Sequence, residues 1–138
     1  MDSVLIVSNT NTTLGIISDM LNSQQFSRIT TTQNCAEARR DLIDNTFDLI
    51  IIDSPLTDEL GDDFALYAAE QTDAGIILIV SGDALSDISP DVEDAGVFVL
   101  PKPVAPDFFY QAVKLLVASR RRVMSLEDEN QKLQKKIE

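Results

Sequence analysis

Three polar residues, each at the end of a short apolar run, could act together on a phosphoryl group. They are Asp53, Ser81 and Lys102. A carboxylate can act as a nucleophile, a hydroxyl can hydrogen-bond a phosphoryl oxygen, and an ammonium can pair with the phosphoryl charge. If the three side chains meet, the sequence predicts a site in which Asp53 carries a phosphoryl group that Ser81 and Lys102 hold.

Each of these residues also has a purely structural interpretation. Asp53 could cap a turn, Ser81 could be an ordinary strand-end residue, and Lys102 could form a structural ion pair with Asp53. Lys102 lies between two prolines, whose fixed backbone dihedrals would aim its side chain, and this favours a place in the site. Cys35 lies at a predicted helix start, where a thiolate would be favoured, but packing as a small apolar residue is the preferred interpretation.

The elements that must position these residues alternate along the chain. Apolar and β-branched runs predict five strands, near residues 4–7, 26–32, 47–52, 76–80 and 97–100. Helices are expected near residues 14–21, 34–45 and 64–69 and from Pro106 onward, with a short or irregular fourth helix within residues 81–94. Because the central strands are apolar throughout, the sheet should be parallel and covered on both faces. We expect an α/β fold, a doubly wound five-stranded parallel sheet of order 2-1-3-4-5 with a C-terminally extended last helix.

Composition excludes several classes of function. The 138 residues include no His and one Cys, which excludes an internal disulfide, a His/Cys zinc site and a Ser-His-Asp triad. The apolar runs are too short to span a membrane and no signal peptide is visible, so we expect a cytoplasmic protein. Residues 1–118 hold 5 basic and 19 acidic side chains, and this acidic body should not bind nucleic acid directly.

The ordered set of strand-end residues resembles the receiver domain of two-component response regulators. In that family the third strand ends in the phospho-accepting Asp, matched by Asp53, and a Gly follows eight residues later, matched by Gly61. A Ser or Thr ends the fourth strand, matched by Ser81 with the small Gly82 behind it. A Lys that precedes Pro follows the fifth strand, matched by Lys102. The resemblance implies a phosphoacceptor at Asp53 and a phosphate-binding switch formed by the other matched residues.

The sequence departs from the family pattern where the first strand ends. Receivers carry two adjacent acidic residues there that hold Mg²⁺, and this chain has Ser8 and Asn9. The Mg²⁺ ligands would then be Ser8, Asn9 and Asp53, of which only Asp53 is a carboxylate. We therefore expect Mg²⁺ to bind weakly. Three acidic residues in nearby loops could compensate: Asp58, Glu59 and Asp83. The family's Tyr or Phe before the Lys is replaced by Val99.

The resemblance implies a regulatory domain rather than an enzyme. A histidine kinase or a small-molecule phosphodonor would phosphorylate Asp53, and the signal would pass to a dimeric C-terminal helix. The alternative is a pseudo-receiver, a dimerisation and protein-interaction module that is not phosphorylated; the missing acidic pair favours it. A hydrolase or phosphatase is disfavoured because the chain lacks a Gly-x-Ser-x-Gly elbow, a phosphate-binding Gly-rich loop and any His.

The C-terminal segment predicts a second unit. We divide the chain into a receiver domain, residues 1–118, and a helical coiled-coil extension, residues 119–138. Heptad spacing predicts a dimer seam through Leu116, Val123, Leu126, Asn130, Leu133 and Ile137, and the same register projects back onto Phe109, Ala112 and Ser119. Val and Ile at a with Leu at d favour a parallel homodimer, and a single Asn at a fixes its register.

The extension also suggests what lies beyond residue 138. The helical pattern stops in mid-register at Glu138, so we expect the helix to link the receiver to an output domain outside this sequence. Residues 120–133 resemble the linker of the ANTAR branch of response regulators, whose output module binds RNA in antitermination. Any contact with RNA would then belong to that module.

Overall fold

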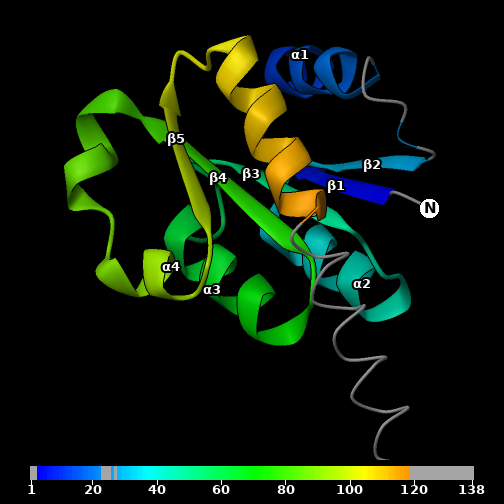
Figure 1. Cartoon of the computed structure of the whole chain (residues 1–138). Helices are drawn as coiled ribbons and strands as arrows, with labels where there is room; N and C mark the ends of the chain where they lie inside the picture. Colours follow the sequence, from blue (N-terminus) through cyan, green and yellow to red (C-terminus); the bar gives the residue numbers. More distant parts are fainter. Residues whose placement is uncertain (1–2, 23–25, 27, 119–138) are drawn as a thin grey trace, which may run out of the picture.

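The fold is the predicted five-stranded parallel α/β fold (Figure 1). The computed structural model describes residues 3–22, 26 and 28–118. The strands pair in the order β2-β1-β3-β4-β5, and every pair is parallel. In chain order the elements are β1 (Ser3–Val7), α1 (Asn11–Asn22), β2 (Arg28–Thr32), α2 (Cys35–Asp44), β3 (Leu49–Asp53), α3 (Gly61–Gln71), β4 (Gly75–Ser81), the 3₁₀ helix η1 (Gly82–Asp87), α4 (Pro90–Asp94), β5 (Phe98–Lys102) and a C-terminal helix over residues 106–118.

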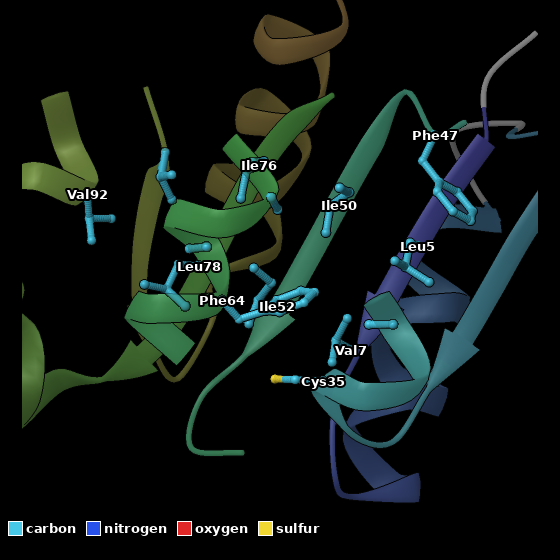
Figure 2. Close-up of a cluster of buried hydrophobic side chains, with 14 of the residues drawn as sticks. Leu5, Val7, Cys35, Phe47, Ile50, Ile52, Phe64, Ile76, Leu78 and Val92 are labelled. Carbon is cyan, nitrogen blue, oxygen red and sulfur yellow. The ribbon is translucent and has the colours of Figure 1, made fainter. Parts of the chain in front are cut away.

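Helices cover both faces of the sheet, as the apolar central strands require. α1 and the C-terminal helix lie over one face, and α2, α3 and α4 lie over the other (Figure 1). Successive residues of β1 point to opposite faces, so Leu5 belongs to the cluster under α2 and α3 while Ile6 belongs to the cluster under α1. All five residues of β3 are buried, because β3 lies in the middle of the sheet. Figure 2 shows the cluster under α2 and α3, which includes Cys35 and Phe64 together with side chains of β3 and β4.

The fourth helical unit is short and irregular, as predicted. It consists of the six-residue η1 followed by the five-residue α4. The Ser89 side chain caps α4 by accepting a hydrogen bond from the Asp91 N–H, and Pro90 occupies the first helical turn, where its missing N–H costs nothing. Val92 is the one buried residue of α4. So little apolar surface explains why the sequence pattern here is weak.

The C-terminal helix packs on the sheet through one face. Phe109, Ala112 and Val113 are buried against β3, β4 and β5, and Leu116 is half-buried beside Gly75. Two positions from the projected heptad register therefore contribute to the core of the domain. The predicted seam residues Val123, Leu126, Asn130, Leu133 and Ile137 lie outside the described residues. None of the helices in the described part of the chain is long and apolar enough to cross a membrane.

Candidate functional site

The predicted site lies at the carboxyl edge of the sheet. Asp53 is the last residue of β3, and Ser8 follows the last residue of β1. Ser81 and Lys102 end β4 and β5 and stand opposite each other in the strand register. Because all five strands are parallel, their carboxyl ends meet at one edge, which brings these residues into the same region.

The Asp53 carboxylate is buried and has a charged partner on one oxygen and a neutral partner on the other. The residue is 3% exposed. Its Oδ1 lies 2.7 Å from the Lys102 Nζ in an ion pair, and its Oδ2 accepts a hydrogen bond of 2.8 Å from the Ser8 Oγ. The Lys102 ammonium also donates to the Ser54 carbonyl oxygen at 2.7 Å. Oδ1 accepts no hydrogen bond from any described residue, so Lys102 is its one polar contact there.

Ser8 has a different place from the one expected of a metal ligand. Its side chain is fully buried, and its hydroxyl donates a hydrogen bond to the Asp53 carboxylate. The same oxygen accepts a hydrogen bond from the Thr10 N–H at 3.3 Å, which anchors the loop after β1. Asn9, the second predicted ligand, is exposed. A neutral hydroxyl thus supports the carboxylate at the position where the sequence suggested a weak cation ligand.

Ser81 and Gly82, which the sequence predicts to be switch residues, lie at the rim of the site. The Ser81 hydroxyl accepts a hydrogen bond from the Ala84 N–H and so caps η1. Ser81 is exposed, and no hydrogen bond joins it to Asp53 in the described part of the chain. A Cβ on Gly82, the first residue of η1, would lie 3.4 Å from the Lys102 carbonyl oxygen, an ordinary van der Waals contact. The structure brings Asp53, Ser8 and Lys102 into contact and leaves Ser81 apart.

The loop after Asp53 directs its acidic side chains away from the site. The Asp58 carboxylate accepts hydrogen bonds of 3.0 Å from the backbone N–H groups of Cys35 and Ala36, at the start of α2. Donation by the Cys35 N–H is the main cause that holds the pKa of Asp58 below its ordinary value. The Glu59 carboxylate forms an ion pair with Arg39 of α2. Both candidate replacements for the missing acidic pair therefore serve to attach this loop to α2.

Arg39, Cys35 and Val99 have structural roles outside the Asp53 pocket. The Arg39 guanidinium lies 4.0 Å from the ring centroid of Tyr67, a cation–π contact that joins α2 to α3. Burial, reinforced by the charges of Asp58 and Glu59, raises the pKa of the Cys35 thiol to about 12. Cys35 is fully buried, so the packing interpretation is confirmed. Val99, which stands for the family's aromatic residue, is half-buried against the core.

These residues do not fit a Mg²⁺ site. No group of three Asp, Glu, Cys or His side chains that could hold a metal ion exists within the described ranges. The one central carboxylate is paired with an ammonium, and Mg²⁺ in proteins requires oxygen ligands in a nearly octahedral arrangement. Asp83, the third candidate replacement, is exposed in the first turn of η1.

A family model decides which group of proteins this fold and site belong to. The model of the response regulator receiver domain matches residues 4–114. The chain belongs to this receiver domain family. A search of curated proteins found no significant sequence match.

Solved structures similar to this receiver confirm the fold. A response regulator receiver domain from Clostridium thermocellum is 17% identical, with 89% of this chain and 99% of that chain covered and a TM-score of 0.78. A protein from Rhodopirellula baltica named as an adenylate cyclase is 19% identical over 95% of this chain and 98% of that chain, with a TM-score of 0.84. At these identities the likeness concerns the fold alone.

A third structure shows the kind of complex that receivers form. The response regulator TrrA from Thermotoga maritima, in complex with Mg²⁺-BeF, is 24% identical, with 84% of this chain and 99% of that chain covered and a TM-score of 0.73. Among the described residues of this receiver, the carboxyl edge of the sheet has one buried carboxylate, Asp53.

Sequence reasoning missed the hydrogen bond from Ser8 to Asp53 and the two contacts from the loop after Asp53 to α2. The family pattern, which has an acidic residue at this position, favours the interpretation of Ser8 as a poor metal ligand. A serine that follows a buried strand, opposite a buried Asp, is also a signal for a hydrogen bond between the two. The contacts of Asp58 and Glu59 left no signal in spacing, since their partners are twenty or more residues away.

Proposed function

We propose that this receiver is the input domain of a cytoplasmic response regulator, not an enzyme, and that it works as a pseudo-receiver that accepts phosphate poorly or not at all. The observation that carries the proposal is the buried Asp53 carboxylate, held by Lys102 on one oxygen and Ser8 on the other. Ser8 and Asn9 would then be a degenerate acidic pair. Signalling would proceed through protein contacts rather than through Mg²⁺-dependent phosphorylation.

Charge supports this reading of the site. Mg²⁺ would neutralise the repulsion between a phosphodonor and the buried carboxylate, and a second acidic residue would be needed to hold the ion. Lys102 matches the family pattern, so the departure lies at Ser8, which donates a hydrogen bond from a neutral hydroxyl to Asp53 at a position where the family has a carboxylate. The pocket has one carboxylate, already paired with Lys102, and we therefore expect it to attract a divalent cation only weakly.

A second candidate function is a conventional phosphoacceptor. The contact between Asp53 and Lys102 favours it, because an ammonium beside the carboxylate would also pair with a phosphoryl oxygen. A histidine kinase or a small-molecule phosphodonor would be the donor, Mg²⁺ would bind weakly, and Ser81 would leave η1 to bind the phosphoryl group. The position of Ser81, one strand away at the same edge, is compatible with such a movement.

In both cases the output would leave through the C-terminal helix. We propose that the helix continues as a parallel coiled coil that dimerises the receiver through Val123, Leu126, Asn130, Leu133 and Ile137, and that an RNA-binding antitermination module of the ANTAR type follows. The proposal is supported by the heptad pattern and by the linker-like sequence of residues 120–133.

Intact mass after incubation with acetyl phosphate and Mg²⁺ tests the proposed function. The wild-type chain is expected to gain no phosphoryl adduct, and Asp53→Asn serves as the negative control. The Ser8→Asp/Asn9→Asp variant is expected to gain an adduct if the pocket lacks only its acidic pair, with circular dichroism to confirm its fold. An adduct on the wild type, absent from Asp53→Asn, would overturn the pseudo-receiver and establish the second candidate.

A further inference from the structure

The loop between β3 and α3, residues 54–60, begins and ends at the same place. A Cβ on Gly61 would lie 2.9 Å from the Ser54 Cβ and Oγ, so the two ends of the loop are in contact. The Ser54 N–H donates a hydrogen bond of 2.8 Å to the Ile79 carbonyl oxygen, which attaches this end to β4. Leu56 is half-buried and packs against the core cluster under α2 and α3. The 54–60 loop is therefore a closed, packed unit rather than an extended connection.

Asp58, near the far end of the loop, supplies the start of α2 with hydrogen-bond acceptors from outside the helix. The first N–H groups of a helix have no partner within it. The Asn34 side chain accepts from the Glu37 N–H at 2.9 Å. The Cys35 and Ala36 N–H groups donate at 3.0 Å to the two oxygens of Asp58. Two of the first three N–H groups of α2 therefore have their acceptor in the 54–60 loop, and the negative charge of Asp58 lies at the positive end of the helix.

Glu59 makes the second attachment to α2, and this one is accessible from outside. Its carboxylate pairs with the Arg39 guanidinium, which also lies 4.0 Å from the Tyr67 ring centroid. The Arg39 side chain is 37% exposed and that of Glu59 is 21% exposed, whereas Asp53 is 3% exposed. Another protein can therefore contact the attachment of the loop, although it cannot reach Asp53 directly.

Lys102 connects the other end of the same loop to the pocket. Its ammonium lies 2.7 Å from the Asp53 Oδ1 and donates a hydrogen bond of 2.7 Å to the Ser54 carbonyl oxygen. One group thus holds both the buried carboxylate and the first residue of the loop. A displacement of Ser54 would take one of these two acceptors away from Lys102.

We propose that the 54–60 loop is a conformational link by which α2 controls the Asp53 pocket. While the far end of the loop is held on α2, the Ser54 carbonyl keeps the Lys102 ammonium beside Asp53, and release of the loop from α2 frees this ammonium. The inference rests on the pseudo-receiver proposed above and names the route by which a protein contact acts on its buried carboxylate. Coupling between two sites is reciprocal, so loss of the Lys102 ammonium must also loosen the loop on α2.

Two double variants serve for the test. Asp58→Ala/Glu59→Ala, the release variant, removes both attachments to α2. Asp63→Ala/Glu70→Ala removes the same charge from exposed positions of α3 and is the matched control. Circular dichroism and urea unfolding confirm that both variants fold.

Amide hydrogen exchange measured by NMR reads the attachment of the loop. In the release variant the Ala36 amide is expected to exchange about tenfold faster or more than in the wild type, because its acceptor is lost. The Glu37 amide keeps Asn34 as its acceptor and is the internal reference. An Ala36 amide that exchanges no faster than in the control variant would overturn the inference.

Acetylation by acetic anhydride, followed by mass spectrometry, reads the pocket. The Lys102 side chain is 36% exposed, so the reagent reaches it. In the release variant Lys102 is expected to react about fivefold faster or more than in the wild type, relative to the exposed Lys114 of the same molecule. The control variant should leave this ratio unchanged. A faster Ala36 amide with an unchanged Lys102 ratio would show that the loop is attached to α2 without controlling the pocket, and would overturn the inference.

The reciprocal measurement needs no change in the loop. Lys102→Met should speed the exchange of the Ala36 amide relative to the Glu37 amide, and Lys114→Met should not, whereas a global loss of stability would speed both amides equally. Equal exchange ratios in the two variants would overturn the link. A phosphoryl adduct on the wild-type chain would overturn the pseudo-receiver without changing these ratios, so the two failures are distinguishable.

Discussion

Replacement of Lys102 by Met removes the charge that accompanies the buried Asp53 carboxylate. Met keeps the length and the apolar stem of the side chain, so the change concerns the ammonium group. The carboxylate would keep one partner, the Ser8 hydroxyl, and would lose the Lys102 Nζ at 2.7 Å. The Ser54 carbonyl oxygen would lose its hydrogen bond from the same ammonium.

The expected loss of stability follows from burial on each side of the pair. Removal of one member of a fully buried ion pair costs about 3–5 kcal/mol, because the other charge is left without compensation. The Asp53 side chain is 4% exposed, but that of Lys102 is 36% exposed, so water already screens part of the interaction. We therefore expect Lys102→Met to lower the free energy of unfolding by about 2–3 kcal/mol.

Urea unfolding followed by far-ultraviolet circular dichroism measures this loss, at one protein concentration for all variants. Lys114→Met is the matched control, because Lys114 is exposed on the C-terminal helix, and it should change stability by less than about 0.5 kcal/mol. Asp53→Asn and the double variant complete a mutant cycle. The double variant should be more stable than the sum of the single losses predicts, by about 1–2 kcal/mol.

The result that would refute this reasoning is equally specific. If Lys102→Met costs no more than Lys114→Met, the Asp53 carboxylate is not a buried charge that depends on Lys102. If the mutant cycle shows no coupling, the 2.7 Å contact contributes nothing to stability. Either outcome would show that Lys102 does not compensate the buried charge of Asp53.

Three further predictions follow from local geometry. Gly61→Ala should lower the free energy of unfolding in urea by about 1–3 kcal/mol, because the new Cβ would lie 2.9 Å from the Ser54 Cβ and Oγ. Gly15→Ala, whose new Cβ would have no atom within 4 Å, should stabilise α1 by up to about 1 kcal/mol. Equal effects of the two substitutions would contradict this prediction. Burial raises the pKa of Cys35 to about 12, so the thiol ionises at lower pH in the unfolded chain than in the folded one. The urea midpoint should therefore fall as pH rises from about 9 toward 12, and it should fall more steeply in the wild type than in Cys35→Ala. The folded protein lowers the pKa of Asp58, so the ionised carboxylate stabilises the fold above its ordinary pKa of about 4, and this stabilisation is lost as pH falls below that value. The difference in free energy of unfolding between wild type and Asp58→Asn should therefore shrink from about pH 7 to about pH 3. A constant difference would count against the contacts of Asp58 to α2.

Much of the fold could be predicted because it depends on patterns that the sequence carries locally. Strands buried on both faces must be apolar throughout, and the runs that form β3 and β4 are. The weak fourth helix was also predictable, since Gly82 and Pro90 interrupt the pattern there. The convergence of Asp53 and Lys102 followed from parallel topology, which places all strand ends at one edge.

The remaining features depend on partners distant in sequence. Asp58 and Glu59 were candidates for a metal site because of their type and their place after Asp53, but α2 offers free N–H groups and Arg39 at the same location. The heptad spacing assigns Phe109 to a dimer seam, although this residue packs on the sheet of its own domain. Phe109 is buried there, and heptad spacing alone cannot distinguish a helix that packs on its own domain from one that packs on a partner.

A calorimetric titration with Mg²⁺ tests the central claim most directly, namely that the Asp53 pocket is satisfied by Lys102 and Ser8 without a metal ion. The wild-type chain is expected to show no saturable heat of binding at millimolar Mg²⁺, and the Ser8→Asp/Asn9→Asp variant is expected to show one that Asp53→Asn abolishes. Saturable binding of Mg²⁺ to the wild type that is lost in Asp53→Asn would contradict this claim and would show that the site binds Mg²⁺ as a conventional receiver does.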